Sequence, residues 1–239
     1  LKLCKKNFFV YESIFSIRFN YSKNISDFIL LLKAALKTRD WQLYDSVFHK
    51  YFQDTNYVEN NRVKYVQAMA IYEKGEKEKA IEFLKGIDLE SEKDNILASK
   101  IAFLKGQYIL RKVELKDLLN VVDEAIPYLV SATKLNPDYY KAWHRWAWAS
   151  EQIYHSDNSK TYAAINAING FIKCVKLRPD NSFSDLIQLV SLFFSIELDD
   201  DNFNNISQCI SLIGNSFFKI IPQLFSQISS NNVKLSEFV

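Results

Sequence analysis

The chain has 239 residues, which is enough for one elongated domain or two compact ones. Hydrophobic residues make up 48% and charged residues 24%, an ordinary balance for a globular protein. The formal net charge of +2 argues against a strongly basic nucleic-acid binder or membrane-surface binder.

Residues 1–23 begin the chain with an interrupted apolar run that has no signal-peptide cleavage site. The chain starts at Leu1 rather than Met, so we expect a part of a longer protein. We predict an N-terminal helical segment over 1–23 that missing neighbours cover. Residues 24–239 are predicted to form one helical-repeat domain.

From residue 24 onward, apolar residues recur at helical spacing. The segment 24–40 has Ser26 and Asp27 as candidate N-caps, and 41–54 repeats the pattern. Residues 62–87 are expected to hold two helices broken at Gly75. Small alanines within these stripes, such as Ala68 and Ala80, let helix backbones approach to about 8–10 Å. With only 5 glycines and 4 prolines, many strands are not expected.

The clearest pattern is an internal repeat whose two copies end in Lys-Leu-x-Pro-Asp. Their prolines, Pro137 and Pro179, lie 42 residues apart. A helix that closes in this way before a new helix is typical of a tetratricopeptide unit, whose usual period is about 34 residues. We place the surplus of about eight residues in the polar linker 154–161.

Later helices are expected at 183–197, 203–213 and 216–229. A helix pair of this kind cannot cover its own apolar face and must stack on its neighbours. The predicted fold is therefore all-α, with antiparallel helix pairs stacked as a TPR-like or HEAT-like α-solenoid.

No motif in the sequence points to catalysis or to a cofactor. Glycine-rich phosphate loops, kinase catalytic-loop motifs and zinc-hydrolase motifs are absent. Glu151 and His155 lie four residues apart without a third ligand near them, and the run Asp199–Asp201 lacks the Gly and Glu of a calcium loop. Three sparse cysteines suit a reducing compartment, and Cys174 is expected to be a small core residue. We expect no catalytic, cofactor-binding or metal-binding residue in this chain.

The segment "YYKAWHRWAWASEQIYH", residues 139–155, contains three tryptophans within a stretch of six residues. Trp143 and Trp146 fall on a broad apolar band that we predict to be core, together with Tyr139, Ala142, Ala147, Ala149 and Ile153. Trp148 instead shares a polar face with His144, Glu151 and His155. Packing on the next helix pair is favoured for it over contact with a partner. The candidate protein-interaction residues are Lys141, His144, Arg145 and Trp148.

The same segment resembles the "WYKAWHxWA" segment of the target-of-rapamycin (TOR) kinases, in the phosphatidylinositol-3-kinase-related kinase family. That segment belongs to the FAT domain, a helical-repeat region N-terminal to the kinase. The downstream segments "AAINAINGFIKCVKL", "NSFSDLIQLVSLFFSI" and "FFKIIPQLFSQISSN" are similar to further FAT segments in the same order. The resemblance covers about residues 60–230, although Phe193 and Phe217 stand where the family has Trp.

The resemblance implies a non-catalytic scaffold of a TOR-type serine/threonine kinase, which braces the kinase domain and binds complex subunits in growth and nutrient signalling. ATP and Mg²⁺ then belong to the kinase domain of the same polypeptide. It also implies a cytoplasmic location, with endomembranes reached through complex partners. The nearly balanced charge predicts no nucleic-acid partner, and a transmembrane segment is not expected because no apolar run approaches the roughly 18 residues that span a membrane. The alternative is a free-standing TPR adaptor for peptides or chaperone tails. That reading needs a matching set of polar residues in neighbouring repeats, whereas only Lys141 and Arg145 are found.

Overall fold

A computed structural model describes residues 13–20, 24–51, 59–112, 117, 119–196 and 199–214. Regular structure within these residues is helical throughout. The chain divides into two compact units, residues 1–97 and 98–239. Successive helices within each unit pack against one another, so the predicted all-α class is confirmed, and the arrangement is consistent with an α-solenoid. The helix expected at 216–229 lies outside the described residues.

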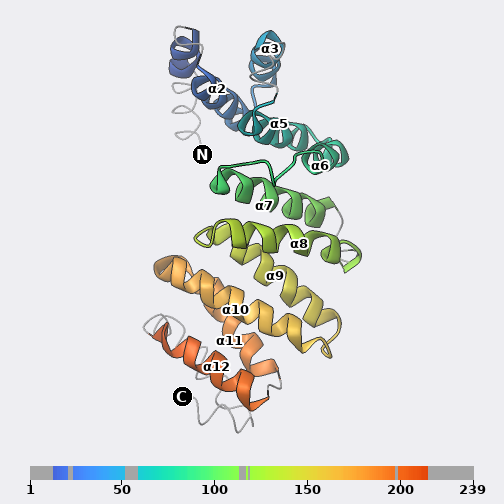
Figure 1. The fold of residues 1–239 in the computed structure, drawn as a ribbon, viewed down its shortest axis with the longest axis vertical. Helices are drawn as coiled ribbons and strands as arrows, with labels where there is room; N and C mark the ends of the chain where they lie inside the picture. The colour runs from blue at the N-terminus through green and yellow to red at the C-terminus, as the bar shows by residue number, and fades with distance from the viewer. Residues whose placement is uncertain are drawn as a thin grey trace. The chain divides into compact units, whose positions relative to one another are not determined.

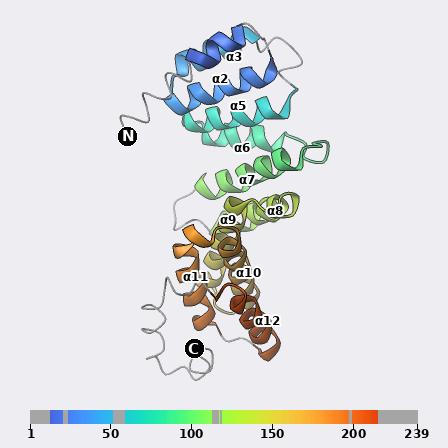
Figure 2. The ribbon, with the colours of Figure 1, turned by 90° about the vertical axis from the view of Figure 1, so that its left-hand side faces the viewer.

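The first unit contains four labelled helices and a helical segment at 13–20: α2 (Ile25–Thr38), α3 (Trp41–Tyr51), α5 (Asn61–Glu73) and α6 (Lys77–Lys85). Helix α2 packs on α3 and α5, and α5 packs on α6 (Figures 1 and 2). One core cluster joins the helical segment at 13–20 to α2, α3 and α5, and its fully enclosed side chains include Phe19, Phe28, Leu32, Ala35 and Val66. Helix α6 buries Ala80, Ile81 and Leu84.

The start of α2 differs from the sequence-based expectation. Its N-cap is Asn24, whose Oδ1 accepts the Ser26 N–H at 2.9 Å. Asp27 is buried and forms an ion pair with Arg18 Nε at 2.8 Å. Ser26 and Asp27 therefore do not cap the helix. Asp27 instead links α2 to the preceding helical segment.

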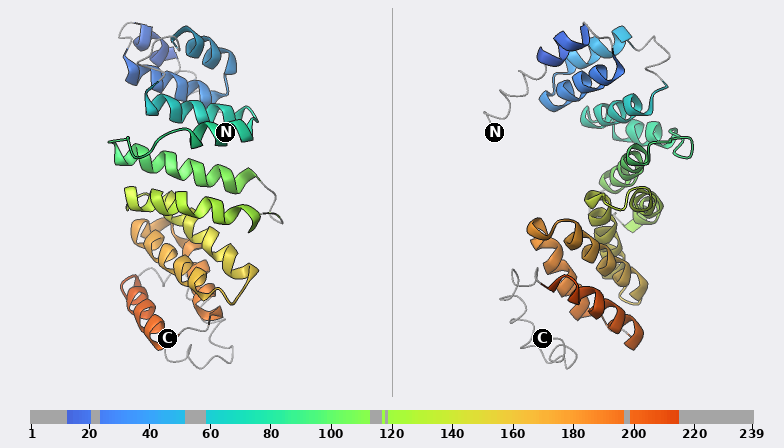
Figure 3. Two further views of the ribbon diagram at one scale, coloured as in Figure 1. Left: turned by 45° about the vertical axis from the view of Figure 1, so that its right-hand side comes forward. Right: turned by 60° about the vertical axis from the view of Figure 1, so that its left-hand side comes forward.

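The second unit contains most of α7 (Asn95–Lys112), then α8 (Leu119–Leu135), α9 (Tyr140–Ser156), α10 (Thr161–Leu177), the short 3₁₀ helix η2 (Pro179–Asn181), α11 (Phe183–Ser195) and α12 (Asp200–Ser211). Helix α9 packs on α8 and α10, and α10 packs on α11 and α12 (Figures 1 and 3). None of the helices within the described residues is both long enough and apolar enough to cross a bilayer.

The boundaries of the repeat lie where the sequence predicted them. The surplus of about eight residues over the usual repeat length does not lie in the predicted linker. Pro137 lies just before α9, and Pro179 begins η2 just after α10. Only residues 157–160 separate α9 from α10, so the linker is short. The long period comes instead from the two helices themselves, each 17 residues long.

Helix α12 begins three residues before the expected position because Asp199 caps it. The Asp199 carboxylate accepts the Asn202 N–H at 2.7 Å, which satisfies an otherwise free backbone donor. Asp200 and Asp201 are exposed in the first turn, where the helix dipole favours negative charge. The acidic run is thus a solvated helix start.

Glycines allow two close helix contacts in the second unit. A Cβ atom at Gly170 would lie 2.7 Å from Ala147 Cβ and 3.2 Å from its Cα. A Cβ atom at Gly106 would lie 2.8 Å from the Leu129 side chain. All three distances are below ordinary van der Waals contact, so these positions hold α10 against α9 and α7 against α8.

Replacement of Gly170 by alanine is expected to lower the free energy of unfolding by about 2 kcal/mol, because the added methyl group forces two packed helices apart. Urea unfolding followed by circular dichroism measures the loss. Gly86→Ala is the matched control, since a Cβ there meets only ordinary contacts from 3.5 Å outward. Equal stability of the two variants would contradict the close contact.

Candidate interaction site on helix α9

Most of the buried residues of α9 are small, namely Ala142, Ala147, Ala149 and Ser150. Ala142, Ala147, Ala149 and Ile153 are buried, as predicted for the apolar band. The larger members, Tyr139, Trp143 and Trp146, are only half-buried and lie at the edge of the band. This corrects the prediction that the tryptophans fill the core, because the small residues let α10 come too close for an indole between the helices.

The two half-buried tryptophans are nevertheless held in place. Trp143 Nε1 donates a hydrogen bond to the Pro137 carbonyl at 2.8 Å. Its ring meets the Trp146 ring edge-on, with centroids 5.5 Å apart. Trp146 in turn lies over Gly170 of α10. The pair therefore ties the repeat boundary at Pro137 to the start of the helix and to its neighbour.

The outer face of α9 presents Lys141, Arg145 and Trp148 at i, i+4 and i+7. Lys141 is exposed, whereas Arg145 and Trp148 are half-buried. The Arg145 guanidinium lies 5.1 Å from the centroid of the Trp148 ring, within cation–π range. Burial and the nearby Arg111 lower the pKa of Arg145. This positively charged aromatic stripe is the part of the predicted interaction set that faces outward.

His144, the fourth predicted interaction residue, is engaged within the fold. Its Nδ1 lies 2.7 Å from Asp185 Oδ1 of α11. Its ring stacks on Tyr140, with centroids 5.7 Å apart. The Tyr140 hydroxyl donates to the other oxygen, Asp185 Oδ2, at 2.9 Å. His144 and Tyr140 thus join α9 to α11 through one carboxylate.

Asp185 is the residue that sequence reasoning missed. Its side chain is fully buried, and burial together with the hydrogen bond to Asp185 raises the pKa of the Tyr140 hydroxyl, so this group stays a donor. Arg178 lies over the Tyr140 ring at 4.3 Å. One pattern could have revealed Asp185, since it lies at i−4 and i−7 from Leu189 and Leu192 on the apolar face of α11.

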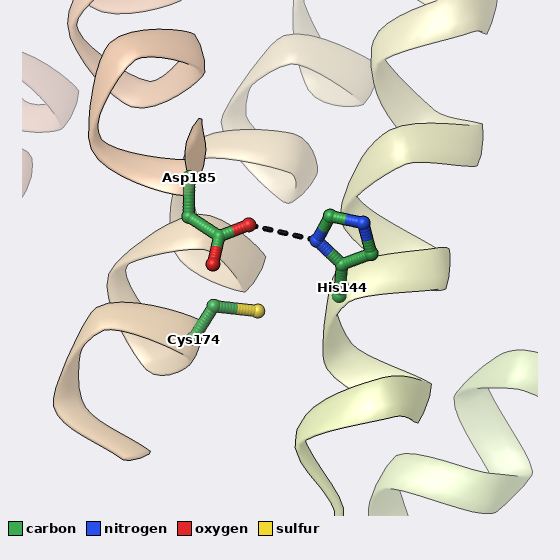
Figure 4. Close-up of side chains that lie close together, drawn as sticks. All are labelled: His144, Cys174 and Asp185. Atoms are coloured by element: carbon green, nitrogen blue, oxygen red, sulfur yellow. Dashed lines mark hydrogen bonds and ion pairs between the residues drawn. The ribbon is translucent and has the colours of Figure 1, made fainter. Parts of the chain in front are cut away.

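Cys174 of α10 completes this cluster. Its thiol is buried, as predicted, and burial followed by the charge of Asp185 raises its pKa. One nitrogen of His144, the Cys174 sulfur and one oxygen of Asp185 all lie within 4.8 Å of one another (Figure 4). Within the described part of the chain, these three residues are the group with the chemistry and spacing to hold a metal ion.

The polar face expected around Trp148 is partly buried. Glu151 is buried, and desolvation raises its pKa despite His155 and His144 nearby. His155 Nε2 lies 3.8 Å from Glu151 Oε1 and is exposed. Glu151 and His155 thus form a pair on α9, and the exposed His155 lies seven residues after Trp148 on the same side of the helix as the stripe Lys141, Arg145 and Trp148.

The all-helical fold and the α9 segment are typical of a helical-repeat protein. The FAT domain family model matches residues 1–191, which is most of the chain. The chain therefore belongs to the FAT domain family, as the resemblance of the α9 segment indicated. The match begins at residue 1, and the division at residue 23 stays a prediction.

Two curated relatives are TOR kinases. The serine/threonine-protein kinase tor1 of Schizosaccharomyces pombe is 28% identical over 186 residues, which cover 72% of this chain and 8% of that protein. The serine/threonine-protein kinase mTor of Drosophila melanogaster is 22% identical over 148 residues, which cover 50% of this chain and 6% of that protein. The chain thus spans less than a tenth of the length of either relative.

Proposed function

We propose that this chain is a non-catalytic scaffold within a TOR-type serine/threonine protein kinase, where it braces the kinase domain and binds complex subunits. The observation that carries the proposal is the FAT family match together with two relatives that are both named as TOR kinases. In this role the chain works in the cytoplasm in growth and nutrient signalling, and reaches endomembranes through complex partners. ATP and Mg²⁺ act at the kinase domain.

The outward stripe Lys141, Arg145 and Trp148 supports a binding role. An exposed lysine beside a stacked arginine and indole offers positive charge and a flat apolar surface, a combination that is enriched at protein interfaces. Arg145 is already held over the ring, so little side-chain freedom is lost on binding. The stripe therefore fits an acidic surface that also carries an apolar side chain.

The first test is the reading frame that encodes this chain. It should continue into a protein kinase domain, and the purified gene product should phosphorylate a peptide substrate in the presence of ATP and Mg²⁺. An early stop codon after Val239, with no kinase activity in the product, would favour the free-standing TPR adaptor instead.

The second test concerns binding through the stripe. Lys141→Glu combined with Trp148→Ala in the full-length gene product should reduce co-purification of its complex subunits at least tenfold. Lys160→Glu is the matched control for charge, since Lys160 is exposed in the loop after α9 and should have no effect. Unchanged subunit recovery with the double variant, shown to be folded by circular dichroism, would remove the stripe from the interface.

A further inference from the structure

The cluster of His144, Cys174 and Asp185 brings together three ligand types from three consecutive helices. His144 projects from α9, Cys174 from α10 and Asp185 from α11, and their side chains point toward one another (Figure 4). Sequence spacing could not show this, because the members lie 30 and 11 residues apart in the chain. We infer that these three side chains form a zinc-binding site that fastens α9, α10 and α11 together.

The ligand set matches zinc chemistry. Zn²⁺ binds thiolate sulfur, imidazole nitrogen and carboxylate oxygen at about 2.0–2.3 Å in tetrahedral geometry. Ligand atoms around such an ion lie about 3.3–3.8 Å apart. The three atoms here already lie within 4.8 Å of one another, and the His144–Asp185 pair is at 2.7 Å. Shifts of about 1 Å would therefore complete three protein ligands, with water in the fourth position.

The surroundings supply what a zinc site needs beyond its ligands. The Tyr140 hydroxyl holds Asp185 Oδ2 and leaves Oδ1 directed at the cluster. Stacking on Tyr140 fixes the His144 ring. Such outer contacts orient metal ligands and raise affinity. His144 is 36% exposed whereas Asp185 is fully buried, so an ion and its water can enter from the His144 side.

Charge also favours the ion. A buried carboxylate needs a positive partner or a full set of hydrogen bonds. On zinc binding, the Cys174 thiol releases its proton to solvent, and thiolate plus carboxylate neutralise the two positive charges of the ion. Binding should therefore weaken as the pH falls.

Cobalt(II) titration of the purified, metal-stripped protein tests the site. We expect one cobalt ion to bind per protein molecule and to give a thiolate-to-cobalt charge-transfer band in the near ultraviolet. Zn²⁺ should displace the cobalt ion and remove this band. Cys174→Ala removes a direct ligand and should abolish the band and weaken zinc binding by at least about 100-fold. His144→Gln keeps a hydrogen-bond donor toward Asp185 and should weaken zinc binding comparably.

Cys209→Ala is the matched control, since Cys209 is a half-buried thiol of α12 outside the cluster and should leave the band intact. Circular dichroism without metal shows whether each variant is folded. If Cys174→Ala does not fold, the His144→Gln variant tests the zinc site in its place. Added Zn²⁺ should also raise the unfolding midpoint of the unaltered protein and of Cys209→Ala only. Absence of the band, or a band of equal intensity in a folded Cys174→Ala or His144→Gln variant, would overturn the site. The result does not depend on the kinase assignment.

Discussion

Replacement of Asp185 by alanine is expected to lower the free energy of unfolding by about 3 kcal/mol with metal removed by a chelator. The carboxylate is fully buried and accepts from the Tyr140 hydroxyl, and it pairs with His144 Nδ1. Hydrogen bonds to a charged group contribute about 1.5–3 kcal/mol each, and the two contacts share one acceptor, so their sum is not fully additive. Urea unfolding followed by circular dichroism measures the change.

Two further variants separate this network from general effects of losing an aspartate. Tyr140→Phe removes one donor and should cost about half as much as Asp185→Ala. Asp199→Ala removes an aspartate that caps α12 at an exposed position, and should cost clearly less. If Asp185→Ala and Asp199→Ala were equally stable, the buried network would contribute little, and α11 would be held by apolar packing alone.

Helix positions were predictable because local spacing determines them. The stripe that begins with Ile25 and Phe28, the break at Gly75 and the boundary at Pro137 all follow from short-range sequence patterns. The N-cap of α2 was not predictable, since Asn24, Ser26 and Asp27 are all plausible capping residues. Tertiary contact decides among them, because Asp27 is buried and pairs with Arg18 of the preceding helical segment.

The cluster around Asp185 was beyond spacing arguments for a different reason. Its members lie on α9, α10 and α11, and no local pattern records that these helices converge at this point. His144 was therefore assigned to an outward polar face, although it lies against a buried carboxylate. By contrast, the burial of Ala142, Ala147 and Ala149 followed directly from helical periodicity.

Two tryptophans on α9 offer the second large test. Trp146→Ala is expected to cost about 3 kcal/mol, at the low end for loss of a large aromatic side chain, because Trp146 is half-buried. Its ring contacts Trp143 and covers Gly170 of α10, so truncation opens the α9–α10 contact. Urea unfolding measures the loss, and tryptophan fluorescence reports whether the environment of the remaining indoles changes.

Trp148→Ala is the matched control, since it removes the same side chain two residues further along the helix. Trp148 lies on the outer stripe under Arg145, and we expect its loss to cost less than about 1 kcal/mol. A cost as large as that of Trp146→Ala would mean that Trp148 holds neighbouring helices together and is not offered to a partner. A near-neutral result leaves a folded variant, so reduced subunit binding by it can be attributed to the lost surface.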